Sequence, residues 1–142
     1  MVEGGLVEVA AASTGAPRPI PPKIAVSLLR IGQEAIANAV RHAEPRHLNI
    51  SLAYNIGFVR LAIKDDGCGF VKSGNLLGFG LRGMRKRSAA LSAELDIVSH
   101  PGEGTCVEVT APLPPNLTLF AHIKRMWKYP LERIFYVNAK TK

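Results

Sequence analysis

The sequence predicts an α+β fold, a two-layer α/β sandwich with helices on one face of a mixed, mostly antiparallel sheet. Two observations favour this class. Five short segments have the apolar character of β-strands, and two longer segments have helical periodicity. Stretches rich in glycine, proline and serine separate these segments. The length of 142 residues and the hydrophobic fraction of 47% suit one compact domain, in which helices and sheet share one core.

The N-terminal part is expected to form a strand and a long helix. Residues 6–12 are a strand candidate, and the proline-rich residues 13–22 continue neither helix nor sheet. Residues 25 to about 43 have helical periodicity, and Pro45 ends the helix. Apolar side chains fall on one arc of this helix: Leu28, Leu29, Ala35, Ile36, Ala39 and Val40. Polar side chains fall on the opposite side: Arg30, Glu34, Asn38, Arg41 and His42.

The remaining elements are two strand pairs and a second helix. Residues 47–54 and 58–64 have the residue pattern of β-strands. The intervening Asn-Ile-Gly predicts a tight turn and an antiparallel hairpin. The glycine-rich residues 67–80 lead into a helix at about 81–91. Residues 95–99 and 106–111 are expected to pair as the last two strands.

Charge and cysteine content limit the possible functions. The formal net charge is +7, but residues 116–142 hold six Lys or Arg against one Glu, a net +5, which leaves +2 for residues 1–115. This disfavours a nucleic-acid-binding function of the main domain. Two cysteines make neither a disulfide framework nor a metal cluster, and no signal peptide or membrane-spanning segment is recognised. A reducing, cytoplasmic setting is therefore expected.

One face of the first helix combines a carboxylate, an amide and an imidazole. Glu34, Asn38 and His42 are spaced by four residues, so they project from the same side. An asparagine oxygen suits Mg²⁺, which takes few protein ligands besides substrate phosphates. Glu34 can accept a proton or order a metal-bound water, while Arg41 and His42 can offset phosphate charge. A solvated helix face without function is the alternative for this helix alone.

Two glycine-rich motifs follow. Asp65 comes at the end of a strand, where Gly67 and Gly69 allow the backbone to approach a flat base closely. The Asp65 carboxylate can accept a hydrogen bond from an amine of that base. Asp66 is expected to face solvent. Gly78, Gly80 and Leu81 open the second helix, whose N-terminal amide groups favour an anion. The alternatives are an acidic turn and an exposed basic helix face.

In order and spacing, R-I-G-Q-E-A-I-A-N-A-V-R-H-A (30–43), D-D-G-C-G-F (65–70) and G-F-G-L-R-G-M-R-K-R (78–87) resemble the N box and two glycine boxes of GHKL ATP-binding domains. This superfamily includes sensor histidine kinases and type II topoisomerases. The resemblance spans residues 5–115, and the short lid at 71–77 is most similar to bacterial kinases of the nitrate-sensor and fluidity-sensor subgroup. The same short lid disfavours a topoisomerase ATPase.

The resemblance implies a Bergerat fold that binds ATP and Mg²⁺. It implies Glu34 and Asn38 as catalytic residues, with Asn38 on the metal and Glu34 organising a metal-bound water. It implies an ATP site formed by Asn38, Arg41, His42, Asp65, Gly67, Gly69, Gly78, Gly80, Leu81 and Thr105. The γ-phosphate would pass to a histidine on a separate dimerisation domain, and from there to a response regulator.

The sequence departs from a complete kinase in lacking an acceptor motif. His42, His47, His100 and His122 are each followed by a residue other than an acid, unlike the acceptor histidines of this subgroup. The chain is therefore expected to act as the catalytic half of a kinase. A nucleotide-binding module without phosphate transfer and a basic nucleic-acid-binding protein are the alternatives. The basic, partly amphipathic extension at 116–142 is expected to dock on the core or to lack fixed structure, with membrane contact as a third option.

Overall fold

The computed structural model describes residues 6–71 and 78–115, so most of the expected lid and the whole extension at 116–142 lie outside the described residues. The strands are β1 (Glu8–Thr14), β2 (His47–Asn55), β3 (Phe58–Asp65), β4 (Glu94–His100) and β5 (Gly104–Pro112). The helices are α1 (Pro22–Asn38), continued by the π-helical turn η1 (Ala39–Ala43), and α2 (Phe79–Ala90). Every element expected from the sequence within these ranges is present. None of the described helices is long and apolar enough to cross a membrane.

The five strands form one mixed sheet in the order β1-β2-β3-β5-β4. β1 pairs with β2 in parallel, and the other neighbouring strands are antiparallel. The register places Asp65, the last residue of β3, opposite both Leu48 and Thr105. The expected hairpin is confirmed, and so is the α+β class.

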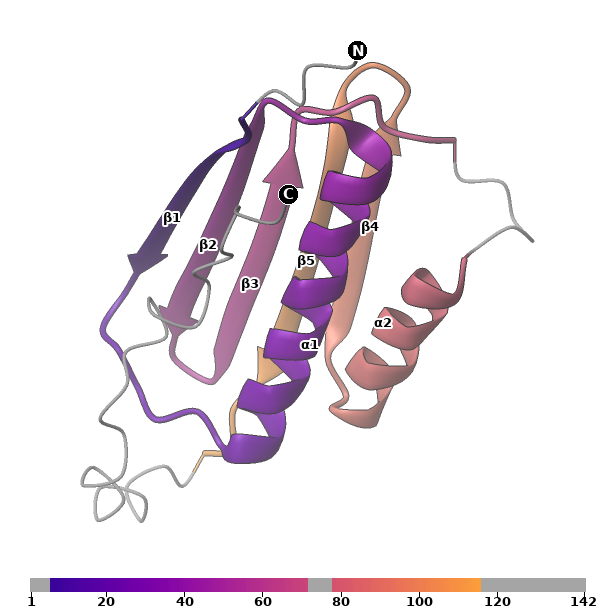
Figure 1. The fold of residues 1–142 in the computed structure, drawn as a ribbon. Coiled ribbons are helices and arrows are strands. Elements are labelled where there is room, and N and C mark those ends of the chain that lie inside the picture. The colour runs from indigo at the N-terminus through magenta and orange to yellow at the C-terminus, as the bar shows by residue number, and fades with distance from the viewer. Residues whose placement is uncertain (1–5, 72–77, 116–142) are drawn as a thin grey trace.

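Both helices lie on the same face of the sheet, and α2 lies alongside α1 at the β4 end (Figure 1). Their apolar side chains and those of the covered sheet face form one core. Ile31, Met84, Val59 and Val109 are completely buried in it. The opposite face of the sheet carries exposed or half-buried side chains and ion pairs such as Arg60 with Glu108 at 3.4 Å. The protein is therefore a two-layer sandwich.

The buried side of α1 differs from the predicted arc. Leu28, Ala35, Ile36 and Ala39 are buried as expected, but Val40 is 54% exposed. The buried stripe instead includes Ile24, Ile31 and Gly32. Because α2 packs along one flank of α1 while the sheet lies beneath it, two directions around this helix are buried. The sequence pattern predicted one buried arc, so it could not show that a second side of the helix is buried as well.

Both ends of this helix have local causes. α1 starts at Pro22, three residues before the expected start, and proline is well accommodated in the first helical turn. The helix widens into the π-turn η1, after which Glu44 adopts a left-handed conformation with φ 48°. The next residue, Pro45, disfavours right-handed helical geometry at Glu44. The expected helix end is confirmed, and the π-turn is an unexpected feature at that end.

Candidate functional site

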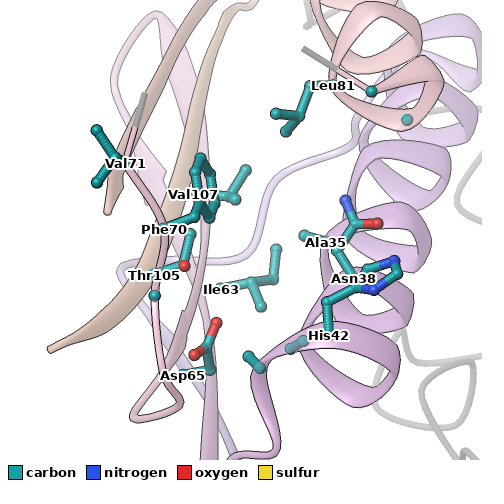
Figure 2. Close-up of a pocket in the computed structure, with 15 residues that line it drawn as sticks. Ala35, Asn38, His42, Ile63, Asp65, Phe70, Val71, Leu81, Thr105 and Val107 are labelled. Carbon is teal, nitrogen blue, oxygen red and sulfur yellow. The ribbon is translucent and has the colours of Figure 1, made fainter. Parts of the chain in front are cut away.

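A cavity of about 400 Å³ lies between the end of α1, the β3–β5 part of the sheet and the start of α2 (Figure 2). This volume is within the usual range for small-molecule sites. The residues around it come from all of these elements: Ala35, Asn38, Ala39, His42, Ala43, Ile63, Asp65, Gly69, Phe70, Val71, Gly78, Gly80, Leu81, Thr105 and Val107. The three motifs of the sequence therefore meet in one place.

Asp65 is the buried acid of the cavity, with only 5% of its surface exposed. Strand β3 ends at this residue, and its side chain points toward the space between the sheet and α1 (Figure 2). Oδ1 accepts a hydrogen bond from the Gly67 amide at 2.9 Å. A carboxylate accepts through two oxygens, so Asp65 keeps acceptor capacity for a donor in the cavity.

A buried hydroxyl pair supports the floor of the cavity. Ser99 Oγ lies 2.9 Å from Thr105 Oγ1, accepts from the Phe70 amide at 2.9 Å and donates to the Gly104 carbonyl at 3.2 Å. Ser99 has a single hydroxyl hydrogen, so donation to Gly104 leaves Thr105 as the donor to Ser99. Thr105 then offers the cavity an acceptor. Ser99 was not predictable from the sequence, because its role depends on the β4–β5 pairing.

Asn38 and His42 reach the cavity from the helix side (Figure 2). Asn38 is the last residue of α1, and His42 lies within the π-turn. The backbone of this turn is tied to the glycine motif, because the Cys68 amide donates to the Ala43 carbonyl at 2.8 Å and Cys68 Sγ lies 3.3 Å from the His42 carbonyl. The turn that carries His42 and the turn that follows Asp65 thus hold each other in place.

Gly67 and Gly69 are required by contacts within the protein. A Cβ on Gly67 would overlap the carbonyl oxygen and Cβ of Ala43. Gly69 has φ 61°, and a Cβ there would overlap the His100 carbonyl. Both glycines therefore allow the turn to pack tightly against its neighbours. Of the two, only Gly69 lines the cavity.

The start of α2 closes the cavity on its third side. Gly78 precedes the helix and Gly80 lies in its first turn, next to the Glu34 carboxylate of α1, which a Cβ on Gly80 would overlap. A Cβ on Gly78 would meet nothing within 4 Å. The acid is well placed beside the positive end of the α2 dipole. Glu34 therefore contacts the helix start and is not among the lining residues.

Most predicted site residues meet at the cavity: Asn38, His42, Asp65, Gly69, Gly78, Gly80, Leu81 and Thr105. Glu34, Arg41 and Gly67 lie outside its lining, with Arg41 exposed. Sequence reasoning missed the apolar walls, among them Ile63, Phe70 and Val107. Their signal is alternation along the strands, because Ile63 and Val107 face the same side of the sheet as Asp65 and Thr105.

Asp66 is exposed, as expected, but it is not free. Its Oδ1 accepts from the Arg46 and His47 amides, both at 2.8 Å, and Oδ2 lies 2.6 Å from His47 Nδ1. These hydrogen bonds, led by the one from the His47 amide, lower the pKa of Asp66 to about 2. The carboxylate therefore favours the folded state above its ordinary pKa of 3.8, and this contribution is lost as the pH falls toward 2.

The donor set of the cavity fits Mg²⁺ only in combination with a phosphate ligand. The described residues contain no group of three or more His, Cys, Asp or Glu placed to hold a metal ion. The Asn38 amide provides one hard oxygen at the cavity, which is the sparse kind of protein ligation that Mg²⁺ has in phosphate sites.

Comparisons with known proteins identify the family of this chain. Residues 24–115 match the family described as histidine kinase-, DNA gyrase B-, and HSP90-like ATPase. The sensor protein VraS of Staphylococcus aureus (strain COL) is 39% identical over 95 residues, 66% of this chain and 27% of the relative. The signal transduction histidine-protein kinase/phosphatase DegS of Bacillus subtilis (strain 168) is 36% identical over 96 residues, 65% of this chain and 25% of the relative. The chain thus spans about a quarter of the length of these relatives.

A solved structure agrees with the fold. The histidine kinase domain of the blue-light activated histidine kinase from Erythrobacter litoralis EL346 superposes with a TM-score of 0.62 at 24% identity, covering 81% of this chain and 55% of that chain. Because the family match extends over well over half of the chain, the protein belongs to the histidine kinase-, DNA gyrase B- and HSP90-like ATPase family. The two bacterial relatives confirm the expected sensor-kinase type of ATP-binding domain.

Proposed function

We propose that this chain binds ATP with Mg²⁺ in the cavity and supplies the γ-phosphate to a histidine on a separate dimerisation domain. One observation supports it above all others. A buried carboxylate with spare acceptor capacity, Asp65, faces a cavity of about 400 Å³ that also holds Asn38 and the start of α2. This combination pairs a base-recognising acid with groups suited to phosphates.

In this proposal the adenine ring lies at the Asp65 end of the cavity. The exocyclic amine donates to the Asp65 carboxylate, and Thr105 offers a further acceptor. The flat faces of the base contact apolar side chains such as Ile63 and Val107. A guanine base would present a carbonyl oxygen to the carboxylate instead of an amine. That mismatch costs binding energy because two acceptors face each other, and it favours ATP over GTP.

The phosphates extend toward the start of α2 and the end of α1. Amide groups at the α2 N-terminus, near Gly78 and Gly80, suit anionic oxygens. Asn38 would hold Mg²⁺, which neutralises phosphate charge when bound. His42 lies on the same side of the cavity, and Arg41 would contribute charge from outside the lining. Glu34, beside Gly80, would orient a metal-bound water.

Phosphate transfer would form a bond from the acceptor nitrogen to the γ-phosphorus while the bond to the ADP oxygen breaks. The protein's contribution is to position the nucleotide and balance its charge. The acceptor histidine and the downstream response regulator belong to other domains or proteins. Because the lid at 71–77 is short, we propose that the chain belongs to the nitrate-sensor and fluidity-sensor subgroup. We also propose that it acts in the cytoplasm.

Calorimetry with ATP and GTP in the presence of Mg²⁺ tests the site. We expect ATP to bind in preference to GTP, and Asp65→Asn and Asn38→Ala each to weaken ATP binding by about tenfold or more. Asp96→Asn and Asn49→Ala are matched controls, since both side chains are exposed on strands away from the cavity. Undiminished ATP affinity in both site variants would overturn the assignment.

A second experiment tests the transfer step. Labelled ATP is mixed with the chain, with and without a separately purified dimerisation domain of DegS. Label is expected on the histidine of the added domain and not on this chain. If ATP binds but the added domain stays unlabelled, a regulatory nucleotide-binding module becomes the better description. Label on this chain would show that one of its own histidines is an acceptor.

A further inference from the structure

Asp66 lies next to the base-recognising acid but does not line the cavity. Its side chain turns toward the start of β2. There Oδ1 accepts from two consecutive backbone amides, Arg46 and His47, at 2.8 Å each. The backbone adds a third link, because the Asp66 amide donates to the His47 carbonyl at 3.3 Å. The residue that directly follows Asp65 is thus held by its side chain and its backbone.

These contacts restrict how Asp65 presents its carboxylate. Asp65 is opposite Leu48 in the register of β2 with β3, so its position depends on where β2 begins. Its own Oδ1 is engaged by the amide of Gly67, which lies immediately beyond Asp66. Without the Asp66 side chain, the 3.3 Å hydrogen bond from the Asp66 amide to the His47 carbonyl would be the remaining link from this residue to β2, which leaves the adjacent peptide planes less restricted. The second oxygen of Asp65 would then be directed into the cavity less strictly.

The same segment connects the turn to the helix side of the cavity. Ala43, the last residue of η1, accepts from the Cys68 amide at 2.8 Å and contacts Gly67. Arg46 and His47 follow three and four residues later. Asp66 therefore closes a loop of contacts that joins the Asp65 turn to the π-turn carrying His42.

We propose that Asp66 is a positioning residue that aims Asp65 at the adenine amine, so that it controls selectivity for adenine nucleotides without touching them. This inference rests on the proposed function. The backbone amides are the important partners. Hydrogen bonds from amides to a carboxylate are stronger than neutral ones, and the His47 amide has the largest effect on the pKa of Asp66, ahead of the His47 ring.

His47 also lies 3.6 Å from Glu8 of β1, through Nε2. The Glu8 amide donates to the Arg46 carbonyl at 2.8 Å, which holds the edge strand to the same segment. The His47 ring thus bridges two exposed carboxylates. Because both pairs are open to solvent, removing the ring leaves the amide contacts of Asp66 in place. This separates the role of the ring from that of the backbone.

The test compares ATP with inosine triphosphate, which carries a carbonyl where adenine has its amine. Calorimetry on the full chain with Mg²⁺ gives the ratio of the two affinities. Asp66→Ala is expected to weaken ATP binding by about tenfold and inosine triphosphate binding by less than about twofold, so the ratio falls. Asp66→Asn keeps an oxygen for both amides and is expected to retain the ratio. His47→Ala and the exposed-acid control Asp96→Ala are expected to retain it as well.

Three outcomes would overturn the proposal. An unchanged ratio in Asp66→Ala would show that Asp65 is aimed without Asp66. An equal loss for both nucleotides would indicate general loosening. A loss in Asp66→Asn as large as in Asp66→Ala would show that the amide contacts are not the cause. If Asp66→Ala does not fold, Asp66→Ser replaces it with the same expectation, since its shorter side chain does not reach both amides.

The result is distinguishable from a failure of the proposed function. In that case the unmodified chain would show no preference for ATP over inosine triphosphate, and Asp65→Asn would change nothing. If the unmodified chain prefers ATP and Asp65→Asn abolishes that preference, the proposed base recognition stands. The behaviour of Asp66→Ala and Asp66→Asn then decides the positioning role alone.

Discussion

Single residues around the cavity perform two different tasks, recognition and tight packing. Asp65, the acid of the D-D-G-C-G-F motif (65–70), combines deep burial with an open acceptor. Gly67 belongs to the same pattern, but it contacts the backbone of Ala43 and lies outside the cavity lining. The pattern named both positions as site residues, and of the two Asp65 lines the cavity. The packing partner of Gly67 was not predictable, because Ala43 is distant in sequence and reaches the turn only through the fold.

Gly67→Ala tests the packing role. The added methyl group would overlap backbone atoms of Ala43, which cannot move away without shifting the end of η1. We expect the free energy of unfolding to fall by about 1–3 kcal/mol, the usual cost of overpacking. Urea denaturation measures it. Gly78→Ala is the control, since its methyl group meets nothing within 4 Å, and it is expected to change stability by less than about 0.5 kcal/mol. Equal effects would contradict the packing role.

Among the elements, α1 and η1 show which structural features the helical periodicity of the sequence can predict. The helix, its approximate length and its end before Pro45 were all predictable from local sequence. The π-turn was not, since nothing in the residue pattern distinguishes it from an ordinary last turn. Two of its carbonyl groups, those of His42 and Ala43, are contacted by Cys68 of the neighbouring turn, so a tertiary contact accompanies the local distortion. Such π-turns occur often at functional sites.

Two truncations on α1 test the corrected buried face. Ile31→Ala removes a completely buried side chain between the helices and the sheet, and is expected to lower the free energy of unfolding by about 2–5 kcal/mol. Val40→Ala, on the predicted arc but 54% exposed, is expected to cost less than about 1 kcal/mol. Chemical denaturation followed by circular dichroism gives both values. A larger loss in Val40→Ala would restore the arc predicted from the sequence.

For the whole molecule, the sheet order brings the motifs together. β5 lies between β3 and β4, so Thr105 of the last strand is placed opposite Asp65 of the third. Both helices then cover one face, and the cavity forms where the ends of α1 and β3 meet the start of α2 (Figures 1 and 2). The motif order predicted that these residues would converge. The position of Ser99 beneath Thr105 depended on strand pairing across the sheet.

The proposed domain boundary at residue 115 can be tested by deleting residues 116–142. Within the part of the chain that the structure describes, the residues that line the cavity all precede this segment. We expect the shortened chain to bind ATP within about twofold of the full chain. At an ATP concentration of 100 times the dissociation constant, both chains should gain about 2.7 kcal/mol of apparent stability. Calorimetry and thermal unfolding measure these values. A tenfold weaker affinity would show that the extension belongs to the ATP-binding unit.

The sequence by itself determined the class of fold and the type of each described element, and it named candidate site residues, most of which line one cavity. These depend on periodicity, turn chemistry and short motifs, which act between neighbours in the chain. Only the tertiary structure decided which strands are neighbours, how Gly67 packs and where Asp66 directs its carboxylate. Arg46 and His47 are 20 and 19 residues away from Asp66 in sequence. Contacts over such separations arise from strand pairing, so their geometry is a property of the folded molecule.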